Sequence, residues 1–240
     1  MRFLKSVMVL LILMVVTQAA WANESLLSVL TKTAPSINTT VLQMAIEAMD
    51  CAVASGIPPS SRLAVIDYSR PSSEPRLWVF DLKSRTLLFD ELVAHGRNTG
   101  DNLAHYFSNE PGSLASSLGL FRTAETYRGD NGYSLRMDGL ERGFNDRARE
   151  RDIVLHGASY VDPKFARNLG RLGRSWGCPA VRLGIARQVI DALKSGQFIF
   201  SYYPDQRWLT TSHFLNCKST ISHLNTVTAI NGNYAAKDVQ

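Results

Sequence analysis

The chain has 240 residues, 45% of them hydrophobic, and carries 26 basic against 21 acidic side chains, a formal net charge of +5. This composition excludes an intrinsically disordered or collagen-like chain, and the length suits one domain with a helical extension. No cluster of lysine and arginine stands out, so we expect no nucleic-acid partner. The mild positive charge would favour an anionic polymer such as a cell wall.

The first 22 residues have the three parts of a secretory signal peptide. Arg2 and Lys5 give a positive start, an uncharged apolar run follows over residues 7–16, and Ala20-Trp21-Ala22 offers a cleavage site between small residues. We therefore expect cleavage after Ala22 and a periplasmic or secreted protein with no membrane span afterwards. The alternative is an uncleaved anchor, which the short apolar run disfavours because a spanning helix needs roughly 20 residues.

Composition divides the chain into a leader at 1–22, an N-terminal helical extension at 23–60, a main domain at 61–218 and a tail at 219–240. Apolar residues from Val41 to Val53 recur at helical spacing. They predict a helix that begins at Asn38 or Thr39 and ends by Gly56. The tail is rich in Ser, Thr and Asn, and we expect it to be disordered.

From residue 63 onwards the pattern changes to short apolar runs typical of β-strands. Strands are predicted at 63–68, 76–82, 87–93, 118–123, 133–137, 152–155 and 197–203, with a hairpin loop at 83–86. A short helix is predicted within 140–151 and an amphipathic helix at 185–194, whereas 95–117 and 160–174 have loop composition. Consecutive strands favour an antiparallel meander over βαβ units. We therefore predict a mainly β fold with an N-terminal helical segment and a helix after Cys178.

Cys178 and His156 are the residues most able to carry chemistry. Cys178 lies between Gly177 and Pro179, which would leave its sulfur approachable, and backbone N–H groups at this turn could face an oxyanion. A thiol needs a neighbouring imidazole to form a thiolate near neutral pH, and His156 is the nearest histidine in sequence. The alternative is a structural cysteine, because free cysteine is often buried as a small hydrophobe.

The chain has three cysteines. In an oxidising compartment this odd number predicts either one disulfide and one free thiol or three free thiols. If Cys178 stays free for chemistry, Cys51 and Cys217 are the only possible pair. No spacing of Cys and His resembles a zinc site, so we expect no bound metal.

The segment from Ser175 to Val181, Ser-Trp-Gly-Cys-Pro-Ala-Val, and the upstream pair His156-Gly157 resemble the L,D-transpeptidase (YkuD-like) catalytic domain. The match is to the subgroup with this cysteine-centred signature. Weaker similar stretches occur in the same order at 93–97, 107–109, 117–123, 139–141 and 145–146, so the resemblance spans about 63–205. It implies that 61–218 is an L,D-transpeptidase-like catalytic domain with a sandwich-like β core.

The resemblance also implies a cell-envelope enzyme that acts on peptidoglycan stem peptides without a metal or organic cofactor. Cys178 takes the place of the nucleophile that attacks a tetrapeptide stem and releases D-alanine. His156 takes the place of the general base, and the backbone carbonyl of Gly157 is the expected group that orients it. Backbone N–H groups around Gly177 and Cys178 are the candidates for stabilising the oxyanion. The oligomeric state is left open.

Trp176 stands where most members of this family have a histidine, and this difference leaves the acceptor open. An amine acceptor makes the chain an L,D-transpeptidase, and water makes it an L,D-carboxypeptidase. A third possibility is a non-catalytic peptidoglycan-binding protein that keeps the fold. The candidate substrate-binding residues are Ser175, Trp176, His95, Asn109, Tyr133, Ser134 and Arg182. For His95 the alternative is an ordinary loop residue, and for Arg182 a solvated arginine at a helix start.

Overall fold

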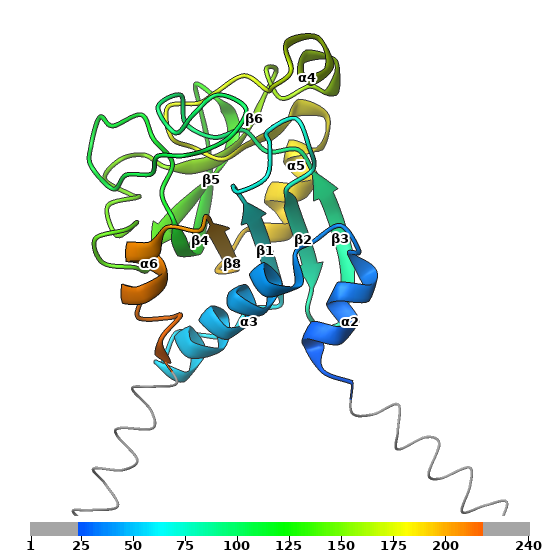
Figure 1. Ribbon diagram of the computed structural model, residues 1–240, viewed down its shortest axis with the longest axis vertical. Coiled ribbons are helices and arrows are strands. Elements are labelled where there is room, and N and C mark those ends of the chain that lie inside the picture. Colours follow the sequence, from blue (N-terminus) through cyan, green and yellow to red (C-terminus); the bar gives the residue numbers. More distant parts are fainter. Residues whose placement is uncertain (1–23, 218–240) are drawn as a thin grey trace, which may run out of the picture.

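The computed structural model describes residues 24–217, so the expected signal peptide at 1–22 and the tail at 219–240 lie outside the described residues. The mainly β fold is confirmed, and its strands form one eight-stranded sheet in the order β3-β2-β1-β8-β4-β5-β6-β7 (Figure 1). The strands are β1 (Arg62–Asp67), β2 (Leu77–Asp81), β3 (Thr86–Glu91), β4 (Gly119–Gly129), β5 (Gly132–Gly139), β6 (Val154–Ala158), β7 (Ala180–Arg182) and β8 (Phe198–Tyr202). The helices are α2 (Leu26–Thr33), α3 (Thr39–Ala54), α4 (Pro163–Leu169), α5 (Leu183–Leu193) and α6 (Gln206–Thr211).

The N-terminal region forms two helices. Pro35 follows the end of α2, where its fixed φ and missing N–H prevent the helix from continuing. Asn38 then caps α3, because its side-chain oxygen accepts hydrogen bonds from the N–H groups of Thr40 and Val41. The predicted start of this helix is therefore confirmed, with Asn38 as the capping residue.

The centre of the sheet is buried on both faces. Leu63 and Val65 of β1 pack in the cluster that includes α3, whereas Ala64 and Ile66 pack in the cluster that includes α5. This alternation follows from the two-residue period of a strand. The parallel neighbour β8 divides its side chains in the same way. Because both faces of these strands are buried, each strand has an uninterrupted apolar run.

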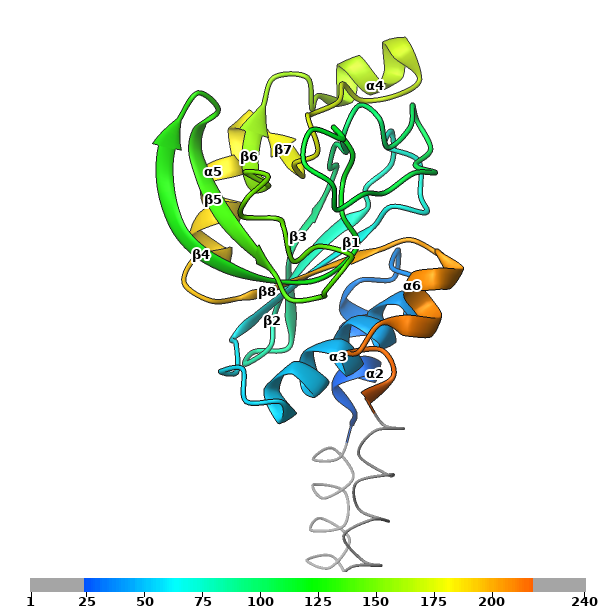
Figure 2. The ribbon, with the colours of Figure 1, turned by 90° about the vertical axis from the view of Figure 1, so that its left-hand side faces the viewer.

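The sheet curls until its two end strands meet. The long β4–β5 hairpin bends, with an irregularity in its pairing between Thr123 and Thr126 (Figure 2). Beyond β3, Ala94 pairs with Ala180 of β7 through backbone hydrogen bonds in both directions. Helix α5 contacts β1, β5, β6 and β7 from within this curl. The sheet therefore closes next to β7, which directly follows the cysteine segment.

Two predictions near the site were wrong. Residues 140–151 form turns and no helix: the Glu141 N–H donates to the Asn145 side-chain oxygen, and the Asn145 N–H donates to the Glu141 carbonyl. The predicted strand at 152–155 instead spans Val154–Ala158, so His156 lies inside β6 and not beyond its end. The strand extends past the apolar run because β6 is paired with β5 on one side and β7 on the other.

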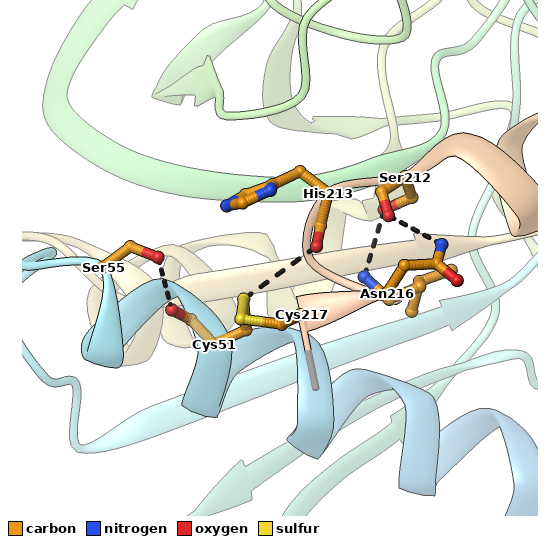
Figure 3. The surroundings of a disulfide bond; sticks show 7 residues. Cys51, Ser55, Ser212, His213, Asn216 and Cys217 are labelled. Atoms are coloured by element: carbon orange, nitrogen blue, oxygen red, sulfur yellow. Dashed lines mark hydrogen bonds between the residues drawn. A yellow bond between two sulfur atoms is a disulfide. The ribbon is translucent and has the colours of Figure 1, made fainter. Parts of the chain in front are cut away.

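Of the two alternatives for the three cysteines, the structure shows the disulfide, which joins Cys51 of α3 to Cys217 and leaves Cys178 as the free cysteine (Figure 3). Their Cα atoms are 5.9 Å apart. The disulfide fastens the segment after α6 to α3. Both ends of the described chain lie at this end of the molecule, whereas α4, β6 and β7 lie at the opposite end (Figure 2). Among residues 24–217, none of the helices has the length and apolar character needed to span a bilayer.

Candidate active site

Cys178 lies in a turn two residues before β7. Its residue is 9% exposed, and its sulfur accepts a hydrogen bond from the Val154 N–H at 3.4 Å. The thiol points at the carbonyl oxygen of Asp152, 3.5 Å away. The sulfur is therefore fixed against the start of β6, in a residue that is almost fully buried.

His156 lies on β6, beside the strand that Cys178 leads into. The parallel register pairs His156 with Ala180, so Cys178 lies opposite the stretch of β6 just before His156. The ring Nδ1 contacts the carbonyl oxygen of Gly157 at 3.0 Å. A carbonyl can only accept, so Nδ1 carries the proton and Nε2 is left as the basic nitrogen. The expected orienting role of the Gly157 carbonyl fits this contact.

Burial shifts the pKa of both groups in the direction that favours the neutral form. It lowers the pKa of His156 below 6.5 and raises the pKa of the Cys178 thiol above 9.0. For Cys178 the N–H of Val154 and the positive charge of Arg151 partly offset the burial. The resting pair is therefore a neutral imidazole and a protonated thiol, and no hydrogen bond joins the two side chains in the described part of the chain.

Ser175 and Gly177 shape the turn that presents the sulfur. The Ser175 hydroxyl donates to the Cys178 carbonyl at 2.6 Å and accepts from the Gly177 N–H at 3.1 Å. Ser175 is 5% exposed, so it is a structural part of the turn and not the substrate contact that we expected. The Gly177 N–H is likewise occupied, which corrects its expected place among the oxyanion donors. The Cys178 N–H lies beside its own sulfur.

Ser116 also holds the turn that carries Cys178 in place. The sequence analysis did not predict this role. The Ser116 hydroxyl donates to the Gly177 carbonyl at 2.9 Å and accepts from the Gly96 N–H at 3.0 Å. Its own N–H donates to Thr99 Oγ1 at 2.7 Å. These bonds tie the cysteine turn to two loops that are distant in sequence. A serine in a loop gives no sequence signal for such a role.

Trp176 is 76% exposed and lies two residues before Cys178 in the chain. Its large apolar side chain projects from the turn that Ser175 holds, so its exposure is imposed by that geometry. An exposed indole beside a reactive sulfur offers a flat apolar surface to a ligand. Of the candidate substrate-binding residues, Trp176 is the one that the structure leaves fully open.

His95 is a buried structural residue. It is 1% exposed, its Nδ1 accepts from the Arg76 guanidinium at 2.8 Å, and its Nε2 contacts the carbonyl oxygens of Gly100 and Asp101. Burial, followed by the charge of Arg76, lowers the pKa of His95 to about 3, so the ring stays neutral. Both nitrogens are engaged, which leaves none for a substrate and corrects the expected groove role.

The other candidates also have internal partners. Asn109 donates to Asp146, Tyr133 donates to Asp191, and the fully buried Ser134 donates to the carbonyl of Gly132. Ser134 lies opposite His156 in the β5–β6 register.

Arg182 is partly exposed but is held in an internal ion pair. It forms two hydrogen bonds with the Glu91 carboxylate, 2.8 and 2.5 Å long. It lines a cavity of about 550 Å³ beside α4, together with Glu91, Pro163 and Arg167, and neither Cys178 nor His156 lines that cavity. Within residues 24–217, no cluster of three or more His, Cys, Asp or Glu side chains is arranged to hold a metal ion.

Comparison with known proteins places these features in a family. The profile of the L,D-transpeptidase catalytic domain matches residues 33–202, which is most of the described chain. No curated protein matches the chain. The similar solved structures include an L,D-transpeptidase from Mycobacterium smegmatis, with 12% identity over 60% of each chain and a TM-score of 0.38. Another is an L,D-transpeptidase from Stackebrandtia nassauensis, with 12% identity over 72% of this chain and 74% of that one and a TM-score of 0.34.

The helical cell shape determining protein Pgp2 from Campylobacter jejuni is 12% identical over 66% of this chain and 56% of its own, with a TM-score of 0.39. The match spans about 60% of the length of the first two solved structures. The assignment therefore rests on the profile match, which contains both Cys178 and His156. The chain belongs to the L,D-transpeptidase catalytic domain family.

Proposed function

We propose that this chain is a cysteine-dependent L,D-transpeptidase that acts on peptidoglycan tetrapeptide stems in the periplasm or outside the cell. The observation that carries the proposal is that the free Cys178 lies two residues before β7, the strand whose Ala180 is paired with His156, and that the Nδ1 of this histidine is held by the Gly157 carbonyl. The family supports a peptidoglycan-modifying activity of this type. The predicted signal peptide supports the location.

In the first half-reaction the Cys178 thiol turns from the Asp152 carbonyl towards His156. Nε2 takes the proton from sulfur as the S–C bond forms at the L-centre carbonyl of the diamino acid in the stem. The carbonyl oxygen becomes an oxyanion, and the Cys178 N–H is its candidate donor. When the intermediate collapses, the C–N bond breaks, Nε2 returns the proton to the departing amine of D-alanine, and a thioester remains.

The second half-reaction transfers the acyl group from sulfur to an acceptor. An amine of a second stem attacks the thioester, loses its proton to His156 and forms the new amide, while the sulfur leaves and is protonated. We assign the acceptor side to the exposed face of Trp176, which adjoins the sulfur. An apolar wall there would favour a peptide chain over water. Water in place of the amine would give the L,D-carboxypeptidase reaction.

The test is to incubate the mature protein with purified tetrapeptide muropeptides and to identify the products by mass spectrometry. Cys178→Ala is the inactive control, and Cys178→Ser keeps the size and polarity of the side chain but lacks the acidity of the thiol. We expect the wild type to release D-alanine and to form cross-linked dimers. We expect neither variant to do so.

Release of D-alanine with only tripeptide monomers would replace the transpeptidase by a carboxypeptidase. No turnover by the wild type, with unchanged binding of muropeptides by Cys178→Ala, would overturn the enzymatic proposal in favour of a binding protein. Turnover that persists in Cys178→Ala would show that the nucleophile is misassigned.

A further inference from the structure

Arg151 lies in the turn just before β6, and its guanidinium makes four hydrogen bonds to neutral acceptors. The acceptors are the carbonyl oxygens of Ser108 and Ala115, at 2.6 and 2.7 Å, and the hydroxyls of Ser117 and Ser113, at 2.6 and 3.0 Å. The side chain is partly buried by this loop. Arg151 therefore fastens one loop over residues 108–117 to the turn that precedes the catalytic strand.

No carboxylate lies within 4.0 Å of the Arg151 guanidinium in the described part of the chain. Its neighbours Arg147 and Arg149 each have carboxylate partners at the surface. A partly buried cation among neutral acceptors keeps much of its field, because neither a counter-ion nor full hydration screens it. The positive charge of Arg151 is thus available to a nearby anion.

Arg151 and the turn that carries Cys178 have neighbouring backbone groups in common. The thiol contacts the carbonyl of Asp152, the residue that follows Arg151. The Ala115 carbonyl, which accepts from Arg151, is also the nearest atom to the position that a Cβ on Gly177 would take, 2.8 Å away. The guanidinium and the turn that carries the sulfur therefore both lie against the Ala115 carbonyl, and the sulfur contacts the residue next to Arg151 in the chain.

We propose that Arg151 is the electrostatic partner of Cys178, so that its positive charge offsets the negative charge that appears on the sulfur when His156 removes the thiol proton. This inference rests on the proposed function for its biological meaning. Arg151 does not touch the reacting atoms and acts as a positioning and charge-balancing residue. The chemistry is a proton transfer alone, in which the S–H bond breaks and an Nε2–H bond forms.

The other groups around the sulfur do not provide this charge. Asp152 raises the thiol pKa through its negative charge, whereas Arg151 lowers it. Tyr68 and Tyr160 also face Cys178, and burial raises the pKa of each to about 12, so both are neutral. His156 is neutral at rest because burial lowers its pKa. The pKa of Arg151 is lowered mainly by its burial. Glu110, Arg147 and Tyr106 affect this pKa less than the burial does.

The experiment measures the rate of Cys178 alkylation by iodoacetamide against pH, over the range in which the protein stays folded. With Cys51 and Cys217 in their disulfide, Cys178 is the thiol that reacts, and Cys178→Ala supplies the blank. We expect Arg151→Gln to raise the apparent thiol pKa by about one unit, which means about tenfold less thiolate at a pH below that pKa. Arg151→Lys keeps the charge and should retain most of the wild-type pKa.

Arg147→Gln is the matched control, because Arg147 is a more exposed neighbour with its own carboxylates. A second pair of variants leaves Arg151 itself unchanged. Ser113→Asp would supply a carboxylate where the hydroxyl now accepts from Arg151, and Ser113→Asn is the neutral control. We expect the Asp variant to raise the thiol pKa and the Asn variant to leave it unchanged, even if Arg151→Gln fails to fold.

An unchanged thiol pKa in folded Arg151→Gln or in Ser113→Asp would overturn the inference. An equal rise in the Gln and Lys variants of Arg151 would also do so, since it would trace the effect to loop position and not to charge. Alkylation needs no substrate. A protein with these shifts but no turnover of muropeptides would therefore refute the proposed function and still support the role of Arg151.

Discussion

At the scale of single residues, the candidate site combines two pKa shifts that both favour the neutral pair. Burial lowers the pKa of His156 and raises the pKa of Cys178. A neutral imidazole can accept a proton, and a protonated thiol can give one. The protonation state needed to begin the reaction is therefore the resting state over a wide range of pH.

We expect kcat/KM for D-alanine release to stay level through neutral pH. On the acid side it should fall only below pH 6.5. His156 must be neutral to serve as a base, and its pKa lies below 6.5. On the alkaline side it should fall only above 9.0, where Cys178 ionises in the free enzyme. A pH profile of initial rates measures this plateau. An acid limb centred above 6.5 would contradict the assignment of His156.

Gly177→Ala should damage both the fold and the activity. Gly177 has φ +128°, and an added Cβ would lie 2.8 Å from the Ala115 carbonyl oxygen and 3.0 Å from Ile153 Cδ1. We expect a loss of about 1–3 kcal/mol in the free energy of unfolding and a displaced cysteine. Urea denaturation and turnover of the variant test this.

Gly184→Ala is the matched control, because Gly184 lies in α5 with no atom within 4 Å of the added Cβ. The control should keep wild-type activity and gain up to about 1 kcal/mol, since alanine favours a helix. Equal stability of the two alanine variants would show that the turn at Gly177 tolerates a side chain.

At the scale of elements, closure of the sheet positions the site. Cys178 lies between the Ser175 turn and β7, and β7 pairs with β6 on one side and with the Ala94 segment on the other. The ion pair between Arg182, at the end of β7, and Glu91, at the end of β3, lies at this closure. The arginine that sequence analysis placed in the substrate site therefore joins two strands.

Arg182→Gln should lower stability without weakening substrate binding. Removal of the guanidinium leaves the 13%-exposed Glu91 side chain without its ion-pair partner, and we expect a cost of about 1 kcal/mol because the arginine itself is partly solvated. Thermal unfolding and the KM for muropeptides measure the two effects. Arg187→Gln is the control, because Arg187 is an exposed α5 residue with a long contact to Asp191. A raised KM with unchanged stability would restore the substrate role.

At the scale of the whole molecule, the disulfide and the site lie at opposite ends (Figure 2). Cys51 and Cys217 are 166 residues apart in sequence, so their bond closes nearly the whole domain into one loop. Cross-linking so long a loop restricts the unfolded chain strongly. Around the bond, Ser55 donates to the Cys51 carbonyl, and Asn216 contacts Ser212 (Figure 3).

Reduction of the disulfide should lower the free energy of unfolding by about 3–5 kcal/mol while the folded protein stays active. The measurement is urea denaturation of Cys178→Ala with and without reductant, alongside turnover by the reduced wild type under folding conditions. The Cys51→Ser, Cys217→Ser double variant should resemble the reduced protein and not respond to reductant. Loss of activity from a reduced protein that is still folded would contradict the separation of the two ends.

The sequence by itself determined the features that depend on local pattern. These are the mainly β fold, the helix that begins after Asn38 and the helix after Cys178. Helix and strand periods and cap residues are local signals. The seven-residue cysteine signature is specific enough to indicate the family that the profile match then showed.

The tertiary structure alone decided which polar residues face a ligand. His95, Asn109, Tyr133, Ser134, Ser175 and Arg182 have internal partners, whereas Ser116 and Arg151 support the cysteine from loops with no recognisable pattern. A buried polar group must find a partner, and that partner comes from whichever segment the fold brings near. Closure of the sheet sets those neighbours, and Glu91 and Arg182, which are 91 positions apart in sequence, meet only because of it.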